Sequence, residues 1–178
     1  IYSAASNINI HSTLITDNTA NEGGGLAAQY SQISMFKSVI FDNLAVNWGG
    51  GMFLSSTTGN ISFSVLTGNQ SGQFADDGYF YSGELNILSS IIAPYETNEQ
   101  NLMFNDGELI VHYSILPSTV ETENWQNSLE AFSETSNIHL DISATTLFHP
   151  GDVFYPAVSS PLIDNASFAM IHENDTLL

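Results

Sequence analysis

Three carboxylates, Asp76, Asp77 and Glu84, are the candidates for catalysis in this chain. A glycoside hydrolase places two carboxyl groups about 5–9.5 Å apart across the bond that it cleaves. Side chains of adjacent strand residues diverge, however, and Asp76 and Asp77 also fit a turn in which other parts of the chain use glycine. We favour the turn and keep a hydrolase-like acidic site as the alternative.

Aromatic residues lie close to those carboxylates and to a glycine-rich turn. Trp48 precedes a triple glycine, and Tyr79 and Tyr81 follow the aspartate pair. Exposed aromatic rings stack on sugar rings, whereas buried ones pack a core. The sequence leaves both interpretations open, and Trp48, Tyr79 and Tyr81 are our candidates for carbohydrate binding.

Metal binding has one weak candidate. Asp17 and Asp42 occupy equivalent positions of a repeat, so their stacked carboxylates would repel each other, and a bridging Ca²⁺ would relieve that repulsion. The five histidines show no metal-ligand spacing, and the chain has no cysteine. We expect no cofactor other than calcium at this site.

The charge of the chain excludes several partners. Nineteen acidic residues and one basic residue, Lys37, give a formal net charge of -18. Such a surface repels phosphate backbones, so we expect no nucleic acid. No apolar run reaches the length of a membrane span, so we expect no membrane insertion. Lys37 is also the one basic residue that could serve a polysaccharide lyase, and we interpret it as a structural or solvated residue within a strand.

A repeat organises the chain around these residues. Residues 18–26 and 43–52 share an Asn, an Ala two residues later and a triple glycine. A period of 25 to 26 residues is typical of stacked repeats. We therefore assign structural roles to three asparagines, as a ladder at a corner, and to six glycines in the turns: Asn18, Asn43, Asn69, Gly23, Gly24, Gly25, Gly49, Gly50 and Gly51.

Short apolar stretches recur at the same period. They cover residues 8–15, 33–40, 61–66, 85–92 and 109–116. Each opens with an alternating apolar pattern, which favours a strand, and each carries a hydroxyl residue followed by two apolar ones. The hydroxyls are Thr13, Ser38, Ser64, Ser90 and Ser114. The sequence predicts an all-β, right-handed parallel β-helix of about six to seven coils of roughly 25 residues.

The predicted coils align apolar residues in columns. One inward column contains Ile8, Ile33, Ile61, Leu85 and Leu109. A second contains Leu14, Val39, Val65, Ile91 and Ile115, and a third contains Ile15, Ile40, Leu66, Ile92 and Leu116. Two adjacent inward columns require a turn or bulge between them.

We predict a single β-helix domain over residues 1–178. Regular coils cover 1–116, a polar excursion with a short helix covers 117–137, and a terminal coil and tail cover 138–178. We expect the chain to be part of a longer protein. Its expected partners are a polysaccharide or surface glycan and further β-helix coils of the same polypeptide or of a neighbouring subunit.

The Phe41-Asp42-Asn43 stretch and the following glycine turn resemble the FxxN and GGA repeats of polymorphic outer-membrane proteins. Residues 160–164 are similar to the SPAID signature of secreted β-helices of the pectate-lyase-like superfamily. These resemblances imply a right-handed parallel β-helix that a bacterium exports and displays or secretes. We expect a non-enzymatic, adhesin-type surface domain with an acidic, glycan-binding face; the alternatives are a carbohydrate-active enzyme using Asp76 and Asp77, and a carbohydrate-binding module without turnover.

Overall fold

The computed structural model describes residues 1–93, 102–112, 114–117, 120–122, 138–140, 148–149 and 152–156, and the side chains of residues 1–92, 102–111 and 114. Within these residues every element is a β-strand, which confirms the all-β prediction. The predicted short helix and most of the predicted excursion and tail lie outside the described residues.

Four coils carry the regular part of the chain. The first contains β1 (Tyr2–Ala4), β2 (Asn7–His11), β3 (Leu14–Thr16) and β4 (Thr19–Glu22). The second contains β5 (Leu26–Gln29), β6 (Gln32–Phe36), β7 (Val39–Phe41) and β8 (Leu44–Trp48). The third contains β9 (Met52–Ser62), β10 (Val65–Thr67) and β11 (Gln70–Ser71). The fourth contains β12 (Gly78–Leu88) and β13 (Ile91–Ala93).

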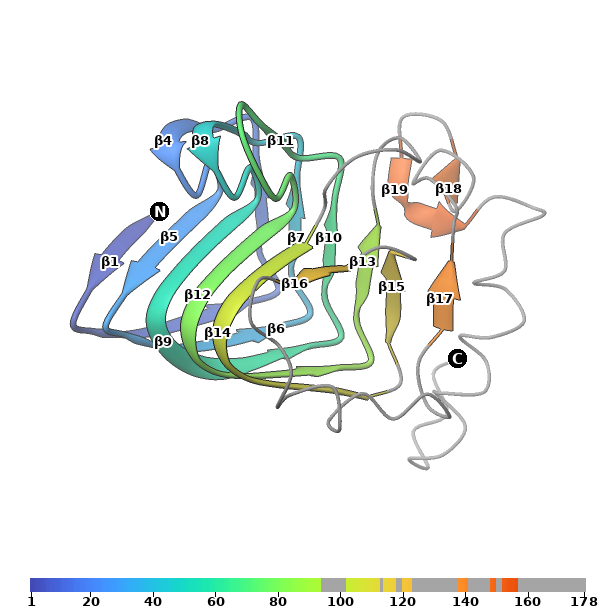
Figure 1. Cartoon of the computed structure of the whole chain (residues 1–178). Helices are drawn as coiled ribbons and strands as arrows, with labels where there is room; N and C mark the ends of the chain where they lie inside the picture. The colour runs from blue at the N-terminus through green and yellow to red at the C-terminus, as the bar shows by residue number, and fades with distance from the viewer. Residues whose placement is uncertain are drawn as a thin grey trace.

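Further strands follow at one end of these coils (Figure 1). They are β14 (Leu102–His112), β15 (Ile115–Pro117), β16 (Val120–Thr122), β17 (Ile138–Leu140), β18 (Phe148–His149) and β19 (Asp152–Pro156). Strands β14 to β17 extend the parallel pairing, whereas β18 and β19 pair antiparallel.

Equivalent strands of successive coils stack in parallel and in register, so the chain is a parallel β-solenoid (Figure 1). Leu14, for example, pairs with Val39, which pairs with Val65. The regular part makes about four turns, fewer than the predicted six to seven. The predicted number of coils was too high because we applied the 25-residue period to the whole chain, whereas the sequence repeat ends at residue 116.

The corners of the coils share one hydrogen-bonded arrangement. Lys37 has a left-handed backbone (φ +49°), and the next residue, Ser38, donates its hydroxyl to the carbonyl of Phe36 at 3.0 Å. The Ser38 Oγ also accepts the backbone N–H of Thr13, in the preceding coil, at 3.1 Å. Each corner of this kind therefore closes a turn and joins two coils with one side chain.

The hydroxyl residues of the repeat mark these corners and not the middle of strands. The predicted strand 8–15 is two strands, β2 and β3, with the corner between them at Ser12 and Thr13. Lys37 was wrongly predicted within a strand, and it lies at the corresponding corner of the second coil. Alternating apolar residues do not reveal a single left-handed residue, which is why the sequence pattern missed these bends.

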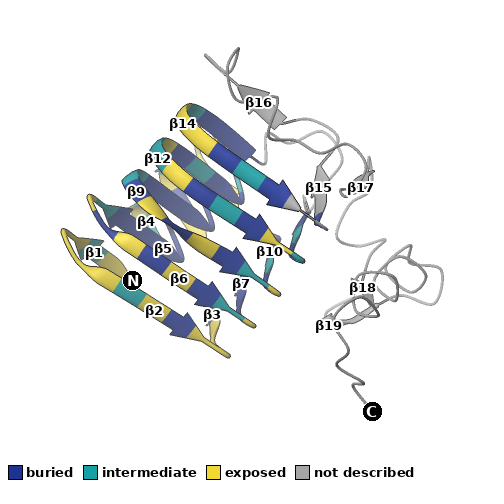
Figure 2. Cartoon of the chain, turned by 90° about the horizontal axis from the view of Figure 1, so that it is seen from below, coloured by how far each residue is buried: buried dark blue, intermediate teal, exposed yellow. Residues whose placement is uncertain are grey.

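Burial alternates along the long strands, with every second side chain inside the solenoid (Figure 2). Ile33 is in register with Gly59, and Gly59 with Leu85, so Ile61 does not belong to the column that we predicted for it. Ile61 instead pairs with Met35 in the next inward column. A Cβ on Gly59 would lie 2.1 Å from the Ile33 carbonyl oxygen, so this position excludes larger residues.

The predicted column of Leu14, Val39 and Val65 is not a core column. Leu14 is 50% exposed, whereas its chain neighbour Ile15 is 5% exposed. The corner at Thr13 resolves the conflict between two adjacent apolar columns. It starts a new strand in which only the middle residue points inward.

An asparagine ladder runs along one corner. The Asn43 side-chain amide donates to Asn69 Oδ1 at 2.9 Å and to the carbonyls of Ile15 and Phe41, each at 2.9 Å. Its Oδ1 accepts the backbone N–H of Asn18 at 3.1 Å. Asn43 is 1% exposed, so water does not replace these bonds when they are lost.

The triple glycines stack on each other beside this ladder. A Cβ on Gly24 would lie 2.4 Å from the carbonyl oxygen of Gly50, and a Cβ on Gly50 would lie 2.2 Å from that of Gln70. Gly23 and Gly49 have left-handed φ values of 57° and 64°. Glycine is therefore required by the close approach of successive turns.

Replacing Asn43 with alanine should destabilise the fold by about 2–4 kcal/mol, because buried backbone groups in two coils lose their partners. Urea denaturation measures this change. The control is Asn60→Ala, which removes an exposed asparagine from β9 and should change stability by less than about 0.5 kcal/mol. Equal effects of the two substitutions would contradict a structural role for the ladder.

Candidate functional site

Three aromatic rings from three successive coils form a group that we call the aromatic stack: Trp48, Phe53 and Tyr79. The Phe53 and Tyr79 rings are nearly parallel, with centroids 5.6 Å apart and an interplanar angle of 5°. The Trp48 ring lies 6.3 Å from Phe53 and 5.9 Å from Tyr79, inclined by 24° and 23°. The structure thus brings the candidates Trp48 and Tyr79 together.

Strand register places these rings side by side. Phe53 of β9 pairs with Tyr79 of β12, and their chain neighbours Leu54 and Phe80 are buried in the core. Because side chains alternate along a strand, Phe53 and Tyr79 lie on the side of the sheet that faces away from the core. Phe53 is nevertheless buried there, at 6% exposed, whereas Tyr79 is partly exposed. Trp48 reaches them because β8 ends immediately before the turn at residues 49–51.

Amide side chains flank the aromatic stack. The Trp48 Nε1 donates to Gln73 Oε1 at 3.2 Å, and Gln73 Nε2 donates to Asn47 Oδ1 at 3.3 Å. On the other side, Asn105 Nδ2 donates to the Tyr79 hydroxyl at 3.2 Å. Trp48, Tyr79 and Asn105 are partly exposed and Gln73 is exposed. The site therefore combines the accessible aromatic surface of Trp48 and Tyr79 with groups that donate and accept hydrogen bonds.

Sequence reasoning missed the amides, although the repeat contains a signal for them. Asn47 and Gln73 are 26 residues apart, and so are Tyr79 and Asn105. A separation of one period places two side chains on neighbouring coils. Pairing the polar residues by this period, as we did for the apolar ones, would have identified these flanking amides, Asn47, Gln73 and Asn105, which we call the rim.

Phe80 and Tyr81, which follow Tyr79 on β12, have different environments from each other. Tyr81 is 47% exposed and lies two residues after Tyr79 on the same strand, but its ring makes no stacking contact within the described part of the chain. Phe80 points inward, where its ring stacks on Phe104 with centroids 4.5 Å apart. Tyr81 thus adds exposed aromatic surface beyond the aromatic stack.

Asp77 completes the asparagine ladder. Its Oδ1 accepts the backbone N–H of Asn69 at 3.3 Å and the Asn69 side-chain amide at 2.8 Å. The position one period after Asn69 holds Tyr95 and not asparagine. The Asp77 carboxylate, which is 0% exposed, occupies the acceptor position that a fourth ladder asparagine would supply.

Asp76 points to a different partner. Its Oδ1 accepts the backbone N–H of Ser71 at 2.6 Å and the Ser71 hydroxyl at 2.9 Å. Burial raises the pKa of the Asp76 carboxyl, and the two hydrogen bonds from Ser71 lower it by a smaller amount. Asp76 and Asp77 therefore diverge into separate hydrogen-bonded environments.

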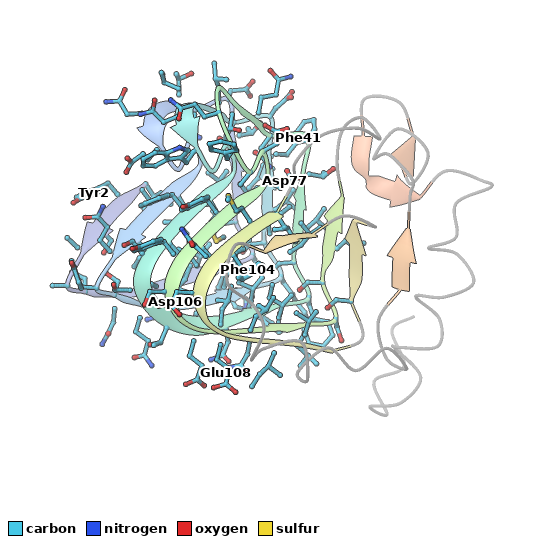
Figure 3. All side chains as sticks on the ribbon, in the orientation of Figure 1. Tyr2, Phe41, Asp77, Phe104, Asp106 and Glu108 are labelled. Carbon is cyan, nitrogen blue, oxygen red and sulfur yellow. The ribbon has the colours of Figure 1, made fainter. Side chains whose placement is uncertain are left out.

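Glu84 does not join the aspartates. It lies on β12, seven residues after Asp77 and beyond the left-handed residues Ser82 and Gly83, which is about 23 Å along the chain at 3.3 Å per strand residue. Figure 3 shows Asp77 near one end of the sheet and Glu108, the register partner of Glu84, at the opposite corner. This arrangement exceeds the spacing that a hydrolase requires.

Acidic residues are distributed over several coils. Exposed Glu84 and Glu108 are register neighbours, and exposed Asp106 lies two residues before Glu108. The calcium candidates Asp17 and Asp42 are exposed corner residues with left-handed backbones, and Asp17 N–H donates to the Asp42 carbonyl at 3.2 Å. No group of three His, Asp or Glu side chains suited to a metal occurs among the described residues. Calcium between Asp17 and Asp42 remains a prediction.

A shallow polar groove crosses the outer surface of the same eight-stranded sheet, over β2, β6 and β9. It has a volume of about 240 Å³ and includes Asn7, Asn9, Gln32, Ser34 and Asn60 in its lining. This volume is below the roughly 300–1,000 Å³ of ligand pockets that enclose small molecules. The groove suits contact with an extended surface ligand more than enclosure of a substrate.

Comparisons of the chain with protein-family models, curated proteins and solved structures found no match. The part of the chain that the structure describes contains no helix that is long and apolar enough to cross a membrane.

Substitutions of Asp77 distinguish its structural role from catalysis. Asp77→Ala should destabilise the protein by about 2–3 kcal/mol, because the Asn69 donors lose their buried acceptor. Asp77→Asn retains an oxygen for both bonds and should cost less than Asp77→Ala. Chemical denaturation of the two variants tests this order, and an equal loss in both would contradict an acceptor role.

Asp76 should make stability depend on pH. Its raised folded pKa means that the folded state holds the proton above the ordinary pKa of 3.8, so its contribution to stability is full below 3.8 and is lost as pH rises through the folded pKa. Asp76→Asn cannot ionise and keeps the oxygen that faces Ser71. We expect the variant to gain stability relative to the natural chain between pH 4 and neutrality, about 7.

Urea denaturation across this pH range measures the difference. Asp106→Asn is the control, because Asp106 is exposed and its Oδ1 also accepts a backbone N–H, from Gly107 at 2.9 Å. A pH-independent difference between the natural chain and Asp76→Asn would show that burial of Asp76 does not affect its ionisation.

Proposed function

We propose that this chain is a non-enzymatic binding domain, exported by a bacterium to its surface in the manner of an adhesin, whose aromatic stack binds a glycan. The observation that carries the proposal is the arrangement of Trp48, Phe53 and Tyr79 on the outer sheet surface, flanked by amides. Aromatic rings contact the apolar face of a sugar while neighbouring amides bond to its hydroxyl groups.

The rim supports this assignment through its hydrogen-bonding capacity. Gln73 accepts the Trp48 indole N–H and donates to Asn47, and the amide groups of Gln73 and Asn47 keep further donor and acceptor positions for a ligand. Gln73 is exposed and Asn47 partly exposed. A ligand with hydroxyl groups at sugar spacing would use these positions without leaving buried polar groups unpaired.

The negative charge of the chain disfavours binding of anionic glycans. With a net charge of -18, the surface repels uronic acids, sulfated sugars and sialylated chains. Neutral glycans avoid that cost, and amino sugars with a free ammonium group gain attraction. We therefore propose neutral or cationic glycans as the ligand class.

A surface location follows from the resemblance to bacterial surface β-helices and from the acidic composition. The distribution of Asp76, Asp77 and Glu84 favours binding over hydrolysis, because Asp77 serves the asparagine ladder and Glu84 lies on another part of the coil. The chain therefore presents its aromatic stack on a rigid scaffold, and the three carboxylates of the hydrolase alternative do not converge on one site.

A glycan array with the natural chain tests the proposal, followed by titration of the best ligand. Trp48→Ala should weaken binding by about 5- to 30-fold, as expected for loss of a stacking ring worth roughly 1–2 kcal/mol. Gln73→Ala should weaken it by a smaller factor. Tyr30→Ala is the matched control, since Tyr30 is 73% exposed and lies outside the aromatic stack.

Reducing-sugar release from the same ligand, with and without a chelator, separates binding from catalysis. We expect binding without release. Release that Asp76→Asn abolishes would replace the proposal with the hydrolase alternative, and an array without any ligand that depends on Trp48 would reject the aromatic stack as a binding site.

A further inference from the structure

Two Asp-Gly pairs occur in the chain, Asp77-Gly78 and Asp106-Gly107. In such a pair the backbone nitrogen of glycine can attack the side-chain carboxyl carbon of aspartate, because glycine has no side chain that obstructs the approach. The product is a five-membered succinimide ring, and its hydrolysis gives either aspartate or isoaspartate. The surroundings of each pair decide whether the folded chain reacts there.

The structure gives the two pairs opposite environments. Asp77 is 0% exposed, and its Oδ1 accepts two hydrogen bonds from Asn69. Asp106 and Gly107 are both exposed. Figure 3 shows Asp77 and Asp106 in different parts of the coil. Water, which the hydrolysis step consumes, therefore has access to Asp106 but not to Asp77.

The Asp106 side chain lies against the amide that would attack it. Gly107 N–H donates to Asp106 Oδ1 at 2.9 Å, so the carboxyl carbon, one bond from that oxygen, lies close to the Gly107 nitrogen. Rotation about the Cβ–Cγ bond then turns the carboxyl carbon toward the nitrogen. Because the two reacting groups are already in contact, ring closure loses little further entropy.

The pairing of β14 with the preceding coil is irregular at the same place. Asp106 pairs with Tyr81 and Glu108 with Glu84, and the register shifts on both sides of Tyr81. Gly107 has a φ of +113°, which residues with a side chain rarely adopt. The regular ladder that would hold the backbone extended is therefore interrupted at this Asp-Gly pair.

We propose that Asp106 is a site of spontaneous isomerisation in the folded chain. The Gly107 nitrogen forms a bond to Asp106 Cγ, and the carboxyl hydroxyl leaves with the amide proton as water. A water molecule then opens the ring. Cleavage of the bond between Cγ and nitrogen restores aspartate, whereas cleavage of the bond between the main-chain carbonyl carbon and nitrogen gives isoaspartate. Neither step needs an oxidant or a cofactor, and the proposal does not depend on glycan binding.

Isoaspartate at this position would displace the strand that follows it. The product carries the main chain through the Asp106 side chain and so adds one methylene group to the backbone. Gly107 packs closely on the preceding coil, since a Cβ there would lie 2.2 Å from the Gly83 carbonyl oxygen. This contact leaves no room for the added length, so we expect Glu108 and the residues after it to lose their register with β12.

Incubation of the natural chain at physiological temperature and neutral pH tests the proposal. Peptide mapping by mass spectrometry, with electron-based fragmentation, measures isoaspartate at each Asp-Gly pair. We expect it to form at Asp106 at least about tenfold faster than at Asp77, because only Asp106 is exposed and held against the attacking amide. Concentrated urea removes this structural difference, so the two rates should then agree within about threefold.

Asp106→Glu is the matched variant, because it keeps a carboxylate but could close only a six-membered ring. It should form no isoaspartate at residue 106 and leave the rate at Asp77 unchanged. Amide hydrogen exchange tests the structural consequence. In the isomerised fraction of the natural chain, exchange at residues 108–111 should be at least about tenfold faster, whereas incubated Asp106→Glu should keep its original rates.

The proposal is wrong if the folded chain forms no isoaspartate at Asp106, or forms it equally fast at Asp77. It is also wrong if the difference between the two pairs persists in urea, because the neighbouring sequence and not the fold would then be its cause. Unchanged exchange at residues 108–111 after isomerisation would contradict the loss of register.

Discussion

The structure depends on one hydrogen-bonded corner, in which a left-handed residue precedes Ser, Thr or Asn. The side chain of that polar residue donates to the carbonyl two residues earlier and accepts a backbone N–H from the neighbouring coil. A single residue therefore bends its own coil and positions the next one. Because most of these side chains are buried, their bonds are not easily replaced by water, and the spacing of corners controls the register of all sheets.

This constraint explains both the glycine turns and the aspartates that follow them. Triple glycines allow successive turns to approach closely, as the short distances from a hypothetical Cβ show. Where the third turn replaces them with Ala75, Asp76 and Asp77, the Asp77 carboxylate takes over the acceptor position of the ladder. The departure from the repeat, which suggested a catalytic site, is thus part of the same structural series.

The stacked coils also generate the aromatic stack. In-register strands place Phe53 and Tyr79 on neighbouring coils, and the turn after β8 brings Trp48 beside them. No loop has to order for these rings to meet, because each projects from a strand or a strand end. A preformed surface of this kind would lose little conformational entropy on binding the glycan that we propose.

The sequence by itself determined the strand class, the coil period and the asparagine ladder, because these depend on residue types that recur every 25 to 26 positions. Only the tertiary structure decided where the corners bend, which way Leu14 and Phe80 point, and that Asp77 is buried while Glu84 is remote. The reason is physical. A left-handed residue such as Lys37 has no compositional signature, and one such residue shifts which side chains after it face the core.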